Sequence, residues 1–152
     1  MAENRFELEN FLPYRLNRAA EFVALRFAAQ YKARYQLTRP EWRTLAALGS
    51  LRRSMTATEI GAHSTMHKTK VSRAVHSLER RRWLRREEDG RDRRFEHLEL
   101  TAAGKQAYEE LTQLARGYQA ELLSMIGTRD MEALLKGLRA IEQAMKKPVT
   151  PD

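Results

Sequence analysis

The sequence contains no cysteine among its 152 residues, which excludes disulfide bonds and switches based on thiol oxidation. No stretch approaches the roughly 20 consecutive apolar residues that a membrane-spanning helix requires. A secretory signal peptide is not expected either, because the chain begins MAENRFELENFLPYRLNR, with early acidic residues and no long apolar run. These absences lead us to expect a soluble, cytoplasmic protein without a membrane partner.

Motifs for catalysis and for metal binding are missing as well. The sequence has no glycine-rich phosphate loop, no nucleophile elbow and no evident carboxylate pair, so we do not expect an enzyme or a cofactor. The four histidines are scattered and match no metal-ligand spacing, so we expect no metal site. These are His63, His67, His76 and His97.

Basic residues are in excess and are concentrated in one part of the chain. The chain has 28 basic and 20 acidic residues, a net charge of +8 and a pI near 10.1, which favours nucleic acid or an anionic membrane surface as partner. Between Met66 and Arg94, eleven basic residues stand against five acidic ones, a net charge of +6. Most of the net positive charge therefore lies in less than a fifth of the chain. The length of the chain predicts a single domain, 1–152.

Helical periodicity dominates the N-terminal part of the sequence. The segment from about Leu8 to Tyr35 has apolar residues spaced by three and four, which predicts a helix. This helix begins near Pro13, because proline is tolerated only in a first turn. A second helix is predicted after the cap Thr38, with Gly49 at its end.

A short helix, a tight turn and an amphipathic helix are predicted next. Thr56 and Glu59 have capping-box spacing and open the short helix. The longer helix, KTKVSRAVHSLERRR, ends near Arg82. Its apolar residues fall in one sector at 100° per residue, and its basic and polar residues fall opposite. The apolar set is Val71, Ala74, Val75 and Leu78. This arrangement is typical of a helix-turn-helix whose second helix enters the DNA major groove. The predicted DNA contacts of this helix are Lys68, Thr69, Lys70, Arg73, His76 and Ser77.

A small hairpin follows, with arginines at its tip. Residues Trp83 to Glu88 and Phe95 to Leu100 predict two strands, joined by a loop around Asp89-Gly90. Such a wing beside a recognition helix can place arginines in the narrow minor groove. Asp89 and Asp92 are expected to pair with neighbouring arginines and to fix their direction. The predicted wing contacts are Arg91, Asp92, Arg93 and Arg94.

The segment KTKVSRAVHSLERRRWLRREEDGRDRRFEHLELTAAG resembles the MarR family of bacterial transcriptional regulators, above all in DGRDRR and in LT..G. The resemblance implies a mainly α fold with a small β-wing, in which a winged helix-turn-helix lobe (38–100) joins a helical dimerisation region (1–37 and 101–147). It also implies a homodimer that binds a pseudo-palindromic operator in double-stranded DNA, usually as a repressor released by a small aromatic or phenolic effector. The chain departs from the family at two positions. Arg82 stands where glycine is frequent, so an easy turn is not expected there. His67 stands where Ser or Thr is usual, so we expect either a weaker cap or a cap from Thr65.

The C-terminal part predicts two helices, each with an apolar seam. The first seam is Tyr108, Leu111, Ala115, Tyr118, Leu122 and Met125, and the second is Met131, Leu134, Leu138, Ile141 and Met145. We favour packing between two chains, because an unburied stripe needs a partner, and the alternative is an internal helical hairpin.

A site for an effector is harder to place from the sequence. Aromatic residues and cations on the first two helices could hold an aromatic carboxylate, and the candidates are Tyr14, Arg15, Arg18, Trp42 and Arg43. The alternative is a core Trp42 with surface arginines around it. For the whole protein, the alternative function is a basic helical adaptor that binds RNA or protein without reading DNA sequence.

Overall fold

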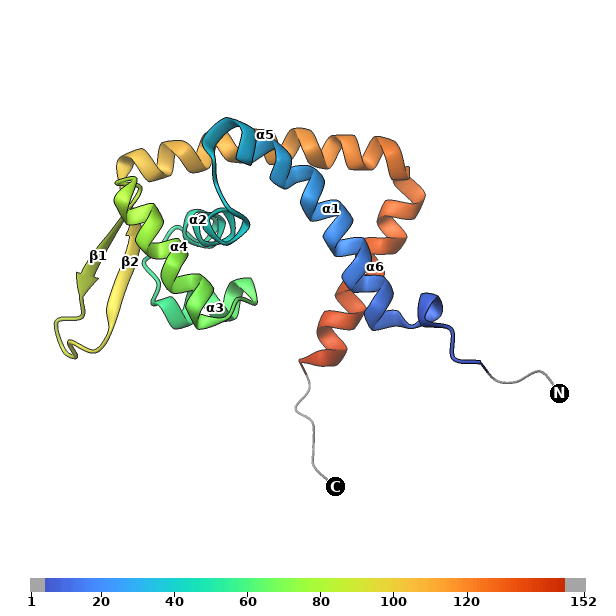
Figure 1. Ribbon diagram of the computed structural model, residues 1–152, viewed down its shortest axis with the longest axis horizontal. Coiled ribbons are helices and arrows are strands. Elements are labelled where there is room, and N and C mark those ends of the chain that lie inside the picture. The colour runs from blue at the N-terminus through green and yellow to red at the C-terminus, as the bar shows by residue number, and fades with distance from the viewer. Residues whose placement is uncertain (1–4, 147–152) are drawn as a thin grey trace, which may run out of the picture. The chain divides into compact units, whose positions relative to one another are not determined.

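The computed structural model describes residues 5–146, and the outermost residues of the predicted single domain, 1–4 and 147–152, lie outside the described residues. The last residue of the predicted dimerisation region, 147, is among them. The chain divides into two compact units, Met1–Leu114 and Ala115–Asp152, with the boundary inside the long helix α5. The elements are η1 (Leu8–Asn10), α1 (Leu12–Tyr35), α2 (Arg39–Leu51), α3 (Ala57–Ser64), α4 (Lys68–Arg80), β1 (Leu84–Glu88), β2 (Glu96–Leu100), α5 (Ala102–Ile126) and α6 (Thr128–Met145) (Figure 1). The predicted fold class, a mainly α protein with a small β-wing, is confirmed.

Helix α2 begins as predicted and ends later than predicted. The Thr38 hydroxyl accepts a hydrogen bond from the backbone N–H of Glu41, and the Glu41 carboxylate accepts one from the backbone N–H of Thr38, which completes a capping box. The predicted end at Gly49 is wrong, because the helix continues to Leu51. Gly49 is instead buried against α5, where an added Cβ would lie 2.4 Å from Cγ of Tyr108. The close approach of α2 and α5 therefore requires a glycine at this position.

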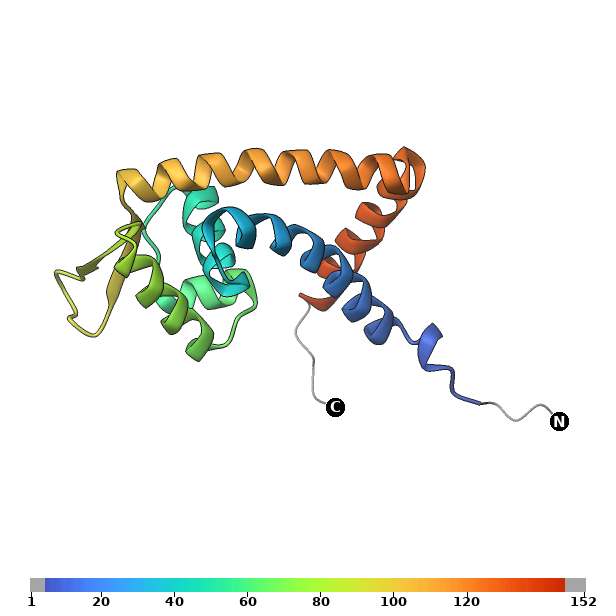
Figure 2. The same cartoon turned by 45° about the horizontal axis from the view of Figure 1, so that its top comes forward.

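The helix-turn-helix forms as the sequence predicts. Thr56 and Glu59 make the second capping box at the start of α3, and Thr65 takes a left-handed conformation in the turn. Helix α4 ends at Arg80, two residues before the predicted end. All four residues predicted for its apolar face are buried, namely Val71, Ala74, Val75 and Leu78. Helix α4 lies against α2 and α3, and Figure 2 shows the three helices together from a second direction.

The wing is a two-stranded antiparallel sheet in which Leu84 lies opposite Leu100 and Glu88 opposite Glu96. Each strand begins one residue after its predicted start. Leu98 and Leu100 are both buried, as their shared face predicts. Two backbone hydrogen bonds between Met55 and Leu98, of 2.8 and 2.9 Å, tie the wing to the segment before α3.

The junction of α4, the wing and α5 explains the LT..G motif. Arg82 has φ 61°, so an arginine occupies the left-handed turn for which glycine is better suited. The Thr101 hydroxyl donates to the carbonyl of Arg82 (2.7 Å) and accepts from the backbone N–H of Gly104 (3.1 Å). A Cβ on Gly104 would lie 2.0 Å from the carbonyl oxygen of Trp83, so only glycine fits there. Thr101 thus holds both ends of the wing to the start of α5.

Large apolar residues remain exposed in the N-terminal part of the first unit and throughout the second unit. In the first unit they are Phe6, Leu8, Phe11, Leu12, Phe22, Val23 and Leu25, and in the second they are Leu123, Met125, Leu134, Leu135 and Met145. Of the second predicted seam, only Met131 is buried. No helix in the described residues is long and apolar enough to span a membrane.

Candidate nucleic-acid interface

The outer face of α4 is polar, exposed and strongly basic. Its exposed residues are Lys68, Thr69, Lys70, Arg73, His76 and Arg80, and Ser77 beside them is half-buried. Within residues 5–146, the side chains of Lys68, Lys70 and Arg73 form no ion pair or hydrogen bond. Because an unpaired cation keeps its full attraction for phosphate and for guanine edges, this face is suited to a polyanion.

Both ends of the turn before α4 are held in place. The Arg43 guanidinium donates to the backbone carbonyl of Ser64 and to the hydroxyl of Thr65 (2.9 Å), so it fixes the turn from α2. His67 is the N-cap of α4, and its Nδ1 accepts from the backbone N–H of Thr69 at 3.4 Å. This distance is long for a hydrogen bond, which agrees with the weaker cap expected for histidine. Thr65, the alternative cap in the prediction, binds Arg43 instead.

The C-terminal end of α4 is anchored by one guanidinium. Arg81 donates to the backbone carbonyls of Tyr35 (2.8 Å) and Gln36 (3.0 Å), where α1 ends. It also lies 3.9 Å from the carboxylate of Glu41 and stacks over the ring of Trp83, 5.2 Å from its centroid. Arg81 therefore joins the end of α4 to both α1 and α2.

The arginines of the wing loop differ in their partners. The Asp92 carboxylate accepts from the backbone N–H of Arg94 (3.0 Å) and from its guanidinium (2.8–3.2 Å). The guanidinium of Arg94, with the backbone N–H as a second donor, holds the pKa of Asp92 below its usual range. By contrast, Arg91 and Arg93 are exposed, and their side chains have no partner in the described part of the chain.

Asp89 behaves differently from the prediction. The pairing expected between the acids of the wing and neighbouring arginines is confirmed for Asp92, but it is wrong for the side chain of Asp89. The Asp89 carboxylate accepts from the backbone N–H of Arg91 (2.8 Å) and lies 2.9 Å from Nε2 of His97. These two contacts, the backbone one first, lower the pKa of Asp89. Local backbone geometry and a cross-strand histidine thus replace the expected arginine.

Two further arginines stabilise the wing rather than extend from it. Arg86 donates to Glu79 of α4 and to Glu96 of β2, both at 2.9 Å, and these carboxylates raise its pKa. Arg85 pairs with Glu99 across the sheet. These cations are partly neutralised, so they contribute less to an anion-binding surface than Arg91 and Arg93 do.

The residues predicted to bind an effector do not lie together. Trp42 packs against the buried rings of Phe27 (5.3 Å) and Tyr31 (5.8 Å), and the guanidinium of Arg18 lies over the ring of Tyr14 (5.5 Å). Phe27 follows Tyr14 by 13 residues of continuous helix, which is roughly 20 Å along α1. Arg15 is exposed on the same turn of α1, and Arg43 holds the helix-turn-helix turn described above. No cluster of acidic residues and histidines suited to a metal ion occurs among residues 5–146.

Comparisons with known proteins agree with this geometry. The model of the MarR family matches residues 35–94, which run from the end of α1 to the tip of the wing. A MarR family transcriptional regulator from Silicibacter pomeroyi is 26% identical, with a TM-score of 0.81 over 93% of this chain and 100% of that one. The transcriptional regulator BldR from Sulfolobus solfataricus is 22% identical, with a TM-score of 0.77 over 88% of this chain and 93% of that one.

A complex of MepR from S. aureus with DNA is also similar in fold. It is 20% identical, with a TM-score of 0.74 over 88% of this chain and 98% of that one. No curated protein matches the sequence.

Proposed function

We propose that the chain is a MarR-type DNA-binding transcriptional regulator, a homodimeric repressor that binds a pseudo-palindromic operator. The family model that matches residues 35–94 and the similar fold of a MarR family regulator support this proposal. In this proposal α4 reads base edges in the major groove, while the wing binds the backbone and the minor groove. A small effector then releases the protein from its operator.

The observation that carries the proposal is the separation of the two faces of α4. The apolar face is buried and fixes the helix in the lobe, and the opposite face presents Lys68, Lys70 and Arg73 without internal partners. Arg73 lies in the middle of the exposed face, where a side chain can reach a guanine edge. Thr69, His76 and Ser77 add shorter donors and acceptors on or beside that face.

The exposed apolar residues favour a dimer. Phe22 is 59% exposed and Met145 is 75% exposed, and both belong to groups of large apolar side chains that a single chain leaves in solvent. Such surface is typical of helices that pack against a second copy. Sedimentation at micromolar concentration should give twice the chain mass, and a stable, well-folded monomer would contradict the proposal.

A gel shift tests the function directly. The protein is titrated onto DNA from upstream of its own gene, with random competitor DNA present. We expect a complex that survives the competitor, weakens steeply with salt and protects two half-sites roughly 34–36 Å apart. Affinity that is insensitive to salt, or protection of a single half-site, would contradict a dimeric operator-binding protein.

The second candidate is an adaptor that binds RNA or protein through its basic surface. The free cations of α4 and of the wing favour any polyanion, and they do not by themselves show base reading. In the same gel shift, equal competition by operator and random DNA, together with tighter binding of RNA, would favour this candidate.

A further inference from the structure

Two adjacent arginines of the wing, Arg85 and Arg86, lie on opposite faces of its sheet. Successive side chains of a strand alternate between the two faces. Arg86 lies opposite Leu98, whose side chain is buried against the lobe, so Arg86 belongs to this inner face. Arg85 lies opposite Glu99 and belongs to the outer face. Two residues of the same type, one position apart, can therefore be compared directly.

The partners of Arg85 all belong to the wing. Its guanidinium pairs with Glu99, its direct neighbour on strand β2, and lies 4.0 Å from the carboxylate of Glu87 on its own strand. Arg85 therefore holds the two strands of the wing together, and it does not join them to another element.

Arg86 joins two different elements. Its Nε donates to the carboxylate of Glu79 on α4, and its Nη1 donates to the carboxylate of Glu96 on β2, both at 2.9 Å. Because the donors of a guanidinium form a rigid, planar fork, two bonds to separate elements fix its orientation. The Arg86 side chain thus ties α4 to both strands of the wing.

The outer part of the wing, residues 85–97, has little else to hold it in place. The base of the wing is fixed by the backbone hydrogen bonds between Met55 and Leu98, but none of residues 85–97 is buried. Within residues 5–146, no other hydrogen bond or ion pair joins this outer part to α4. Figures 1 and 2 show both strands leaving the end of α4 and extending away from the lobe.

The pair between Arg86 and Glu79 is too exposed to contribute much to stability. The two side chains are 35% and 41% exposed, and ion pairs at the surface contribute little to the free energy of unfolding. The pair can nevertheless restrict the direction of a segment that has no buried anchor. Arg91 and Arg93 lie in that segment without partners, and a wing free to change direction would have to be ordered on binding DNA, which costs affinity.

We propose that Arg86 is a positioning residue that fixes the direction of the outer part of the wing relative to α4. This direction is then set before DNA binds, so that α4 and the arginines of the wing loop contact DNA together. The consequence for DNA rests on the proposed function, whereas the fixed direction in the free protein does not.

The direction of the wing is measured without DNA, by electron–electron resonance between two spin labels. The chain has no cysteine, so Ser72→Cys on the exposed side of α4 and Gly90→Cys in the wing loop provide unique labelling sites. A Cβ at Gly90 meets no atom within 4 Å, so the loop accepts the change. Labelled protein is diluted with an excess of unlabelled protein, which limits the measured distances to a single chain.

Three methionine variants compare the two arginines. Glu79→Met and Arg86→Met should each widen the distribution of distances between the labels, and Arg85→Met is the matched control that should leave its width unchanged. All three should lower Tm by less than about 4 °C, since each breaks only exposed ion pairs. An unchanged width in Glu79→Met and Arg86→Met would overturn the proposal, and so would equal widening in all three variants.

Binding to operator DNA separates positioning from charge. Glu79→Met removes a negative charge from α4, so an effect of charge alone would strengthen DNA binding. The proposal predicts the opposite, a loss of affinity of roughly three- to tenfold, because the wing must be ordered when DNA binds. Arg93→Ala should also cost less affinity in the Glu79→Met protein than in the unmodified protein. Tighter binding by Glu79→Met, or strictly additive losses, would contradict the consequence for DNA.

The positioning role and the proposed function fail in different ways. If the distances widen in Glu79→Met and Arg86→Met but the unmodified protein shows no preference for operator DNA, the positioning role stands and the proposed function falls. If operator binding is specific but the distances stay unchanged in both variants, the positioning role falls alone.

Discussion

Helix α4 and the wing are both rich in basic residues, but they use them in different ways. Helix α4 is fixed by a buried apolar face, so its cations are not needed for structure and remain unpaired. The wing has little buried surface beyond Leu84, Leu98 and Leu100, and most of its loop is exposed. It therefore uses Arg85, Arg86 and Arg94 to hold its own shape through ion pairs. Whether a basic side chain is available to bind DNA therefore depends on whether it already has an ion-pair partner within the protein.

The largest effect should come from removing the packing that fixes α4. Leu78 is fully buried, so Leu78→Ala should lower the free energy of unfolding by about 2–5 kcal/mol. Thermal denaturation measures the loss. Ser72→Ala, on the exposed side of the same helix, is the control and should change stability by less than about 0.5 kcal/mol. A small effect at Leu78 would mean that packing does not position the recognition helix.

A smaller but clear loss is expected at Arg81. Arg81→Ala leaves the carbonyls of Tyr35 and Gln36 without their donor, and it should destabilise the fold by about 1–3 kcal/mol. Arg80→Ala is the matched control, because the neighbouring arginine is exposed and has no partner in the described residues. Denaturant titration compares the two variants. Equal stability would show that Arg81 does not anchor α4.

Arg93 and Arg94 are adjacent in the wing loop, so they allow an unpaired and a paired arginine to be compared directly. Arg93→Ala should reduce the slope of the salt dependence by about 0.9 per half-site, the value for one phosphate contact, and therefore by about 1.8 for the dimer. Arg94→Ala should reduce it less, because Asp92 already neutralises part of that charge. It should instead loosen the loop, which amide hydrogen exchange at position 94 and at Phe95 reports. Identical salt slopes for the two variants would contradict the division into free and paired arginines.

The smallest effect concerns pH. The pKa values of Asp89 and Asp92 are lowered in the folded wing, so their contribution is fully present above the unfolded value near 3.9 and is lost as pH falls through the lower folded values. Amide exchange in the loop should therefore show added protection at pH 6 that disappears only in strong acid. Asp92→Asn should remove the part of this pH dependence that comes from Asp92 and leave the part that comes from Asp89, and an unchanged profile in that variant would contradict the assignment.

Local signals in the sequence predicted much of the architecture. The cap at Thr38 and the capping box of Thr56 and Glu59 were predicted correctly, because both depend on residues close in sequence and need no tertiary information. The buried face of α4 and the wing followed from periodicity. Gly49 was misread as a helix end because its partner, the ring of Tyr108, is distant in sequence.

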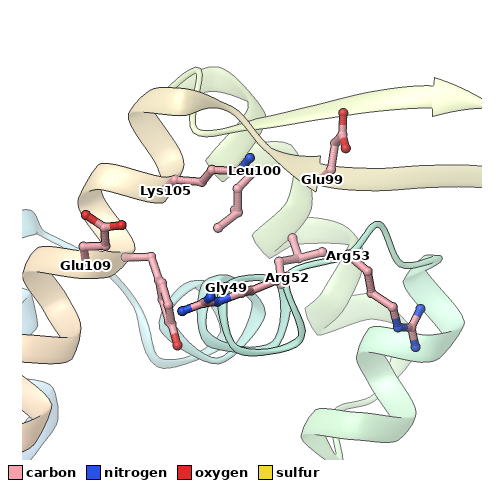
Figure 3. Close-up of a pocket in the computed structure, with 9 residues that line it drawn as sticks. Gly49, Arg52, Arg53, Glu99, Leu100, Lys105 and Glu109 are labelled. Atoms are coloured by element: carbon pink, nitrogen blue, oxygen red, sulfur yellow. The ribbon is translucent and has the colours of Figure 1, made fainter.

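Contacts between distant residues limited the prediction of the site. The sequence predicted which residues of α4 face outwards, but not which arginines are paired. Arg81 binds carbonyls that precede it by 45 and 46 residues, and Asp89 binds His97 on the opposite strand. A pocket lined by the end of α2, the end of β2 and the first turns of α5 was missed for the same reason, since three separate elements form it (Figure 3). Only the folded lobe brings these groups together.

We expect α4 to determine the preference for the operator sequence, and the wing to bind DNA without contributing to that preference. Operator and scrambled DNA are titrated at two salt concentrations with the unmodified protein, Arg73→Ala and Arg93→Ala. Arg73→Ala should cost roughly 1–3 kcal/mol per half-site on the operator and reduce the preference over scrambled DNA. Arg93→Ala should weaken both DNAs nearly alike. If Arg73→Ala leaves the preference intact while Arg93→Ala abolishes it, the reading element is the wing, and the account is wrong.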